Sequence, residues 1–256
     1  MIELWLIIID KLTTEVITMA LYSPLRWVPS LYFAMGLPFV VLNMVSAVLF
    51  KDLGISDSQI AFWTSLIMWP WTIKFLWSPF LELYRTKKFW VVATQLLSGV
   101  LFGVAALSLH MPTFFSVTVA VFAVVAFSGA THDIAADGVY MSELSTAAQA
   151  KYIGWQGAFY NLAKLVATGG LVWLAGWLYE SFSADGTATF DASVRSWTVV
   201  LMILCASNVL SYYLSWERIP QMLTQSMIAL CHNKYVFLIL VNLLMLVVGM
   251  FLDSFA

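Results

Sequence analysis

Long runs of apolar residues dominate the sequence, and polar residues gather in the short stretches between them. Seven runs are recognisable, at residues 27–50, 59–82, 89–109, 114–138, 152–178, 195–214 and 235–252. An α-helix needs about 20 residues to cross the hydrocarbon core of a bilayer, so each run has the length of a transmembrane helix. A transmembrane β-barrel would instead show alternating segments of about ten residues. The pattern therefore predicts an all-α membrane protein with seven transmembrane helices.

The composition excludes a soluble enzyme. Of the 256 residues, 62% are hydrophobic and 10% are charged, whereas ordinary soluble domains have about 45–50% and about 25%. The net charge of −2 gives no indication of a nucleic-acid partner. Cys205 and Cys231 lie in apolar stretches without metal-ligand spacing, and no hydrolase or phosphate-loop motif is present. We therefore expect no enzymatic activity, no cofactor and no metal site.

Charged residues in the connecting loops predict the orientation, because Lys and Arg concentrate on the cytoplasmic side. The loops after the second and fourth runs carry Arg85, Lys87, Lys88 and Lys151. The opposite loops carry Lys51 and Arg195 against the acidic residues Asp52, Asp57, Glu180, Asp185 and Asp191. We therefore expect a cytoplasmic N-terminus and a multi-pass protein of a bacterial inner membrane.

Two acidic residues lie near the end of the fourth run. Asp133 and Asp137 are four positions apart, so both carboxylates lie on one face of a helix, and His132 precedes them. A carboxylate in hydrocarbon costs several kcal/mol, so this face must look at protein or water. Two interpretations stay open: the acids are solvated at the helix end or cap the next loop, or they form a gating or proton-linked polar face.

Lysine also occurs inside two apolar runs. Lys164 lies about 12 residues into the fifth run, roughly 18 Å deep in a helix, and Gln156 and Asn161 precede it. Lys74 lies deep in the second run. Both lysines require a partner or a water-filled cavity. Lining of a solute cavity and ion pairs with Asp that lock the bundle are the two alternatives.

Four stretches resemble the major facilitator superfamily, closest to its AmpG-like muropeptide permeases. They are SPLRW at 23–27, YFAMGLP at 32–38, IKFLWSP at 73–79 and GATHDIAADG at 129–138. The resemblance covers residues 22–215 and implies a six-helix bundle, half of a fold whose two halves rock about a central cavity. It also implies uptake of cell-wall muropeptides or a related solute, coupled to protons.

The same resemblance indicates the residues of the pathway. We expect the substrate or proton pathway to involve Asp133, Asp137, Lys164, Lys74, Asn161, Gln156 and His132, the last of which replaces the glutamine expected in this motif. Gating contacts in the cytoplasmic loop are expected from Glu82, Arg85, Lys87 and Lys88, although the glycines usual in this loop signature are absent.

The end of the chain resembles a different family. Residues 219–221 open an amphipathic run, and residues 233–253 resemble a segment of the large membrane subunit of a TRAP-type transporter. We therefore divide the chain into an N-terminal extension (1–21), a six-helix half (22–215), and an amphipathic linker with a seventh transmembrane helix (216–256).

Together these features predict a secondary transporter, or half of one, for a small solute. Its expected partners are the lipid bilayer, the solute, and a second half supplied by another chain or by a second copy; no nucleic acid is expected. Two alternatives stay open: a truncated or chimeric membrane protein that does not transport alone, and a membrane assembly or sensory subunit.

Overall fold

All regular elements that the structure describes are helical. The computed structural model describes residues 24–184 and 186–216, so the predicted extension at 1–21 and the predicted helix at 235–252 lie outside the described residues. The predicted all-α architecture is confirmed for this part of the chain. Its elements are η1 (Pro24–Arg26), α2 (Val28–Val40), the π-helical turn η2 (Val41–Val45), α3 (Ser46–Asp52), α4 (Asp57–Ile67), α5 (Trp69–Ile73), η3 (Lys74–Leu76), α6 (Ser78–Leu83), α7 (Lys87–Ser108), α8 (Phe114–Glu143), α9 (Thr146–Leu165), the π-helical turn η4 (Val166–Leu171), α10 (Val172–Ala184) and α11 (Thr189–Trp216).

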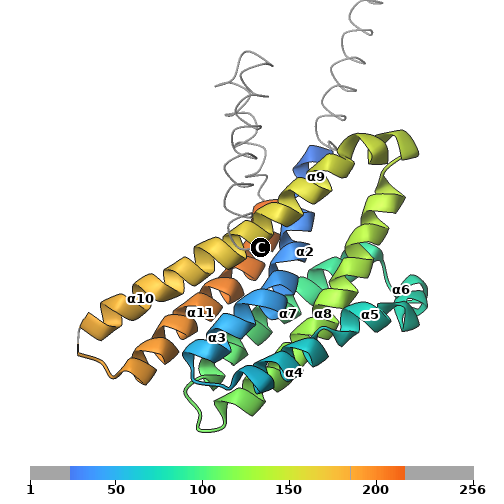
Figure 1. Cartoon of the computed structure of the whole chain (residues 1–256). Helices are drawn as coiled ribbons and strands as arrows, with labels where there is room; N and C mark the ends of the chain where they lie inside the picture. The colour runs from blue at the N-terminus through green and yellow to red at the C-terminus, as the bar shows by residue number, and fades with distance from the viewer. Residues whose placement is uncertain (1–23, 185, 217–256) are drawn as a thin grey trace, which may run out of the picture.

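These elements form six segments that run back and forth (Figure 1). We name them segment I (α2 to α3), II (α4 to α6), III (α7), IV (α8), V (α9 to α10) and VI (α11). Within residues 24–184 and 186–216, five helices are long and apolar enough to cross a membrane, which agrees with a multi-pass membrane protein. They are Val28–Asp52, Lys87–Ser108, Phe114–Glu143, Thr146–Ala184 and Thr189–Asn208.

Segment II differs from the single helix predicted over residues 59–82. It is a succession of short helices, because new helical turns begin at Trp69 and Ser78. Pro70 and Pro79 each stand in the first two positions of those turns. A proline is tolerated there because its missing N–H would have had no partner in the helix. The prolines therefore divide the segment, and Lys74 lies in the resulting break.

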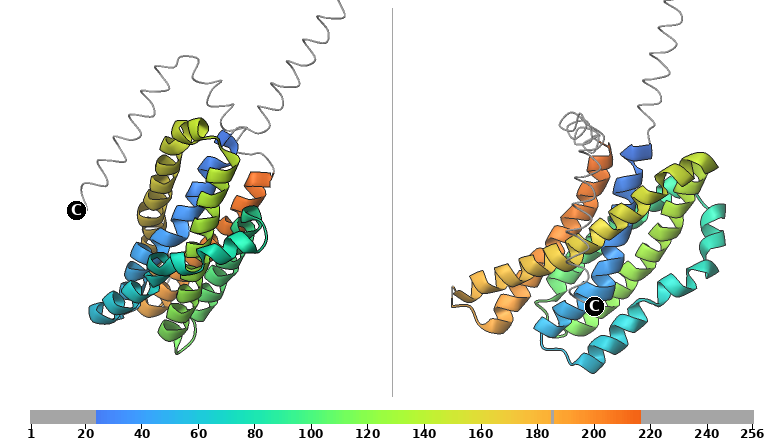
Figure 2. Two further views of the ribbon diagram at one scale, coloured as in Figure 1. Left: turned by 90° about the vertical axis from the view of Figure 1, so that its right-hand side faces the viewer. Right: turned by 45° about the horizontal axis from the view of Figure 1, so that its top comes forward.

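Segments I and IV lie at the centre of the bundle. Segment I packs against α9 and α8, segment II packs against α8, and α7 packs against α8 and α11. The left view of Figure 2 shows α9 on one side of the bundle and the C-terminal part of α11 on the other, and α10 packs against α11. Segments I, II, IV and V consequently share one broad face, which looks toward the viewer in Figure 1.

Aromatic side chains fill the core toward one end of the bundle. Phe50 is fully buried and contacts Phe115 edge-to-face, with ring centroids 5.1 Å apart, and Phe122 lies on its other side at 6.0 Å. Trp197 is also buried, and its indole N–H donates to a carboxylate oxygen of Asp52 at 3.0 Å. These contacts tie segment VI to the end of segment I.

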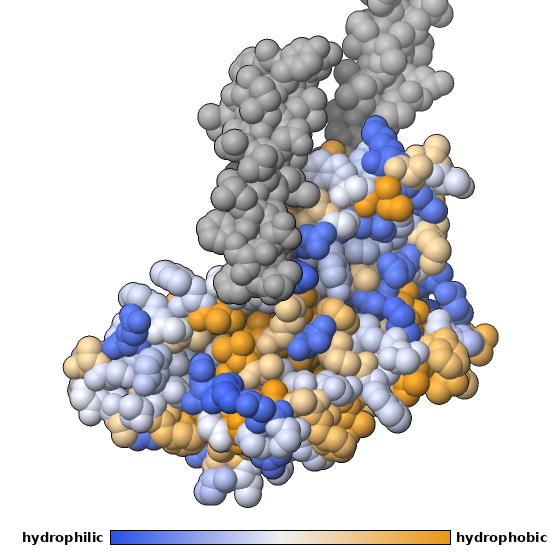
Figure 3. All heavy atoms as spheres, in the orientation of Figure 1, coloured by the Kyte–Doolittle hydropathy of each residue, from blue (hydrophilic) through white to orange (hydrophobic). Residues whose placement is uncertain are grey.

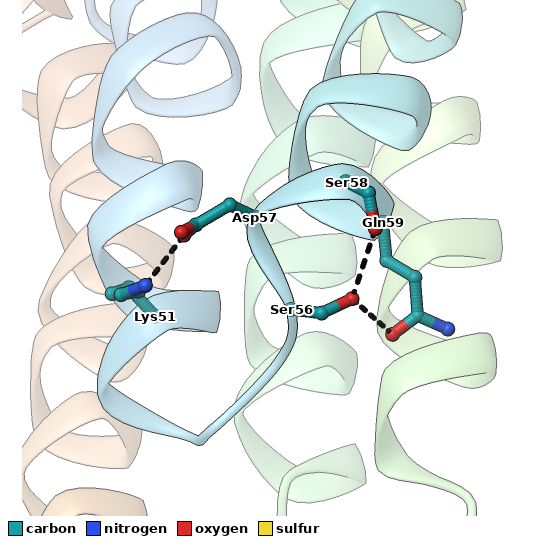
Figure 4. Close-up of polar contacts among 5 residues, drawn as sticks. All are labelled: Lys51, Ser56, Asp57, Ser58 and Gln59. Carbon is teal, nitrogen blue, oxygen red and sulfur yellow. Dashed lines mark hydrogen bonds and ion pairs between the residues drawn. The ribbon is translucent and has the colours of Figure 1, made fainter.

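The connection between segments I and II is held by polar contacts in the exposed part of the molecule (Figure 4). The Lys51 ammonium lies 2.5 Å from a carboxylate oxygen of Asp57, and the two side chains are 59% and 81% exposed. The Ser56 hydroxyl contacts the side chains of Ser58 and Gln59. Ion pairs this exposed contribute about 0–1 kcal/mol, so the contacts shape the turn more than they stabilise the fold.

Candidate functional site

An ion pair joins segments II and IV within the bundle. The Lys74 ammonium lies 2.6 Å from Oδ2 of Asp133, with side chains 34% and 13% exposed. Lys74 reaches α8 from the break between α5 and α6, where the chain cannot continue as a regular helix. A second contact supports the same junction, because the Trp77 indole N–H donates to the Thr131 hydroxyl at 3.2 Å. One of the two predicted roles for lysine, an ion pair with Asp, is thus observed for Lys74.

Asp137 lies one helical turn after Asp133 and has a different set of partners. The Tyr32 hydroxyl, from segment I, donates to Oδ1 of Asp137 at 2.9 Å. The same hydroxyl accepts a hydrogen bond from the Gln156 side-chain amide of segment V. One phenol therefore links segments I, IV and V. Sequence reasoning missed Tyr32, although it lies in the stretch 32–38 that carried the family resemblance.

His132 points away from these acids, into the contact between α7 and α8. Its Nδ1 lies 3.1 Å from the Thr94 hydroxyl. Ser128 donates to the Thr94 carbonyl and accepts from Ser98, both at 2.9 Å. The His132 side chain is buried, and its Nε2 has no hydrogen-bond partner among the described residues. The structure therefore places the His132 side chain in a buried interhelical network that is separate from the contacts of Asp133 with Lys74 and of Asp137 with Tyr32.

Lys164 lies next to the midpoint of the 39-residue helical stretch Thr146–Ala184. At 1.5 Å per residue this stretch is about 58 Å long, nearly twice the roughly 30 Å of a bilayer core. The side chain is partly buried and forms no ion pair with any residue that the structure describes. Its carbonyl accepts from the Thr168 hydroxyl at 2.9 Å, at the start of η4. Asn161 is exposed, and its amide donates to the Gly157 carbonyl of its own helix.

The predicted loop residues lie together at the C-terminal end of α8. The Lys87 ammonium is 3.1 Å from Glu82, and the Lys88 ammonium is 2.9 Å from Glu143 at the end of α8. Arg85 has a left-handed backbone with φ of 64°, and its guanidinium lies 5.6 Å from the centre of the Phe89 ring. These contacts hold the loop between segments II and III against segment IV.

The ion pair of Lys74 with Asp133 lies on the face shared by segments I, II, IV and V. The hydrogen-bonded group of Tyr32, Asp137 and Gln156 lies on the same face. Figure 3 shows hydrophilic surface gathered on that face over the upper part of α8, next to apolar surface. The arrangement can hold a charged or polar solute, and it can transfer a proton at a carboxylate. The described residues include no group of His, Cys, Asp or Glu able to hold a metal ion.

Comparisons with known proteins match the second part of the chain. Residues 152–256 match the family described as tripartite ATP-independent periplasmic transporter, DctM component. A "putative dicarboxylate transporter subunit" of Paracoccus pantotrophus is 37% identical over 92 residues, which are 36% of this chain and 44% of that protein. The "C4-dicarboxylate TRAP transporter large permease protein DctM" of Vibrio cholerae serotype O1 is 44% identical over 75 residues, 29% of this chain and 17% of that protein. No solved structure matches.

These matches support the TRAP-like resemblance for the second part of the chain. The chain spans less than half the length of both curated relatives. The family match begins at residue 152, within α9, so it includes Gln156, Asn161 and Lys164 as well as the expected stretch at the chain end. None of these matches supports the resemblance to the major facilitator superfamily, and the family match overlaps residues 152–215, which that resemblance also covers.

Proposed function

We propose that the chain is a component of an inner-membrane secondary transporter and that the face of segments I, II, IV and V lines one side of its solute pathway. The observation that carries the proposal is Lys164, a cation near the middle of a 39-residue apolar helical stretch and without an ion-pair partner among the described residues. A charged side chain at that depth is expensive unless it meets water, protein or a solute. A solute pathway supplies such surroundings.

The packing of the segments favours half of a two-bundle transporter. Segment I packs against V as IV packs against II, while I contacts IV and III contacts VI. This set of contacts is preserved when segments I, II and III are exchanged with IV, V and VI. Repeats of three helices within each six-helix half are typical of the major facilitator superfamily. We propose that a second bundle, from another chain or a second copy, covers the shared face.

The charges suggest an anionic solute and a proton as the coupling ion. Lys164 offers a positive charge for a carboxylate. The curated relatives are named for dicarboxylates, and muropeptides, which the first resemblance implies, also carry carboxylates. We propose Asp133 as the group that exchanges the proton. Protonation of its carboxylate would break the ion pair with Lys74, so the charge state of segment IV would determine its contact with segment II.

Uptake by proteoliposomes tests this function. The full chain, with a pH gradient and radiolabelled carboxylate solutes, is expected to give uptake above empty vesicles, and Asp133→Asn is expected to lower it roughly tenfold or more. Asp191→Asn is the matched control, because Asp191 is exposed in the first turn of α11. If the wild-type chain and Asp133→Asn both give no uptake above empty vesicles, the transporter proposal is wrong.

A membrane assembly or sensory subunit is the second candidate. It is favoured by the contacts of Asp133 and Asp137, whose carboxylates are each satisfied within the bundle by Lys74 and Tyr32. A truncated or chimeric chain would share these contacts. Both alternatives predict a folded protein that gives no solute uptake in the assay above.

A further inference from the structure

Three aromatic side chains from three segments form a row across the shared face. Phe39 of α2 meets Trp71 of α5 edge-to-face, with ring centroids 5.1 Å apart and an interplanar angle of 82°. On its other side Phe39 lies 6.2 Å from the ring of Tyr160 in α9. All three side chains are partly exposed. The row therefore runs from segment II through segment I to segment V.

Two glycines let the outer rings of this row lie close to the central helices. A Cβ atom on Gly129 would lie 2.8 Å from Cζ2 of Trp71, and a Cβ on Gly36 would lie 3.1 Å from Cδ2 of Tyr160. Gly129 precedes Asp133 by one helical turn, so the row lies beside the ion pair with Lys74. The rings are thus held against helices I and IV and border the polar part of the face.

Segment V carries two hydrogen-bond donors, one in the row and one next to it, that have no partners in the part of the chain that the structure describes. The Tyr160 hydroxyl and the Lys164 ammonium make no hydrogen bond or ion pair with the residues that the structure describes. The two residues are four positions apart, so their side chains lie on the same side of α9. A hydroxyl and an ammonium in such an apolar stretch fit an anionic acceptor.

We propose that Phe39, Trp71, Tyr160 and Lys164 form a subsite for a solute that carries a carboxylate next to a ring. The ring lies on the aromatic row, and the carboxylate accepts from Lys164 and from the Tyr160 hydroxyl. The inference rests on the proposed function and narrows its solute class. An open-chain dicarboxylate would leave the row uncovered, whereas a ring-bearing anion contacts both parts of the subsite.

Three soluble probes separate the two halves of the subsite. Glucuronate has a sugar ring and a carboxylate, glucose has the ring alone, and succinate has carboxylates without a ring. Calorimetric titration of the purified full chain is expected to show glucuronate binding most tightly. If the sugar ring gains as much from one aromatic side chain as a second aromatic ring would, the contact corresponds to about three- to tenfold in affinity. Trp71→Leu is therefore expected to weaken glucuronate by that factor and leave succinate unchanged, and Trp71→Phe is expected to retain most of the affinity.

Variants on segment V test the carboxylate half. Lys164→Gln and Tyr160→Phe are expected to weaken glucuronate and succinate and to leave glucose unchanged. Trp173→Leu, at a tryptophan that is 69% exposed on α10, is the control and is expected to change none of the three. Thermal unfolding of each variant shows that it is folded.

The result that overturns the inference is a folded wild-type chain that binds succinate as tightly as glucuronate or binds none of the probes. An equal loss of both anions in Trp71→Leu contradicts it as well. Vesicle uptake keeps this failure distinct from failure of the proposed function. Uptake of succinate without ring selectivity overturns the subsite alone, whereas selective binding without uptake of any solute overturns transport alone.

Discussion

At the scale of single residues, the pairing of Lys74 with Asp133 depends on unequal burial. The Asp133 side chain is 13% exposed and the Lys74 side chain 34%, so the carboxylate has lost more of its hydration than the ammonium. Removal of the lysine alone leaves a charge that water reaches poorly. Removal of both charges leaves no unpaired group and often restores stability.

A double-mutant cycle tests this pairing. We expect Lys74→Met to lower the free energy of unfolding in detergent by about 2 kcal/mol, less than the roughly 3–5 kcal/mol of fully buried pairs because Lys74 is partly hydrated. The double variant with Asp133→Leu is expected to recover most of that loss. Lys51→Met is the control, since its pair with Asp57 is exposed and contributes about 0–1 kcal/mol. Strict additivity of the two single changes at Lys74 and Asp133 would contradict the pairing.

The residues of the site were predictable only as far as local spacing reaches. The i,i+4 spacing predicted that Asp133 and Asp137 share one face of a helix. The position of Lys74 deep in an apolar run indicated that its ammonium needs a partner or a water-filled cavity. Tyr32 is separated from Asp137 by 105 positions, and no periodicity reports such a contact. The direction of the His132 side chain was not predictable from the sequence either, because it depends on how α7 packs against α8.

At the scale of elements, two π-helical turns meet inside the bundle. Val41–Val45 interrupts segment I and Val166–Leu171 interrupts segment V, and the two turns contact each other. In each case a hydroxyl donates to a carbonyl four residues earlier, from Ser46 at 2.6 Å and from Thr168 at 2.9 Å. Bonds of this kind bend helices, and π-helical turns are frequent at functional sites.

Glycine substitutions in and beside these turns have opposite expected effects. A Cβ on Gly169 would meet nothing within 4 Å, so Gly169→Ala is expected to raise the free energy of unfolding by about 0.5–1 kcal/mol. Gly36→Ala is the matched comparison, because its Cβ would lie 3.2 Å from Cβ of Ala163 at the contact of segments I and V. We expect it to destabilise the protein by about 1–3 kcal/mol. Thermal and denaturant unfolding in detergent measure both, and a destabilising Gly169→Ala would show that the turn requires glycine.

The hydropathy pattern predicted the existence of these elements and missed their interruptions. A run of apolar residues has the same hydropathy whether its turns are α-helical or π-helical. The prolines of segment II predicted a kink, but the division into α5, η3 and α6 depends on packing against α8. The break matters because it positions Lys74 against Asp133.

At the scale of the whole molecule, charge differs between the two ends of the bundle. One end carries the loop of Arg85, Lys87 and Lys88, while the other carries Asp52 and Asp57 beside Lys51. The basic end is expected to be cytoplasmic, because Lys and Arg are retained on that side during insertion. The six described segments put these two loops at opposite ends, since segment II runs between them (Figure 1).

Cysteine labelling in intact cells tests this orientation. In a chain whose Cys205 and Cys231 are replaced by serine, Ser58→Cys is expected to react with a membrane-impermeant maleimide, since Ser58 is exposed in the first turn of α4, directly after the loop that follows segment I. Lys88→Cys is expected to react only after permeabilisation, because it lies 67% exposed at the basic end. Asp185, in the loop after segment V, lies outside the described residues, so Ala188→Cys is the second external site. Reaction of Lys88→Cys in intact cells, with protection of Ser58→Cys and Ala188→Cys, would show that the orientation is opposite to the predicted one. The Asp133 and Tyr32 contacts, which lie toward the basic end of α8, would then open to the outside of the cell.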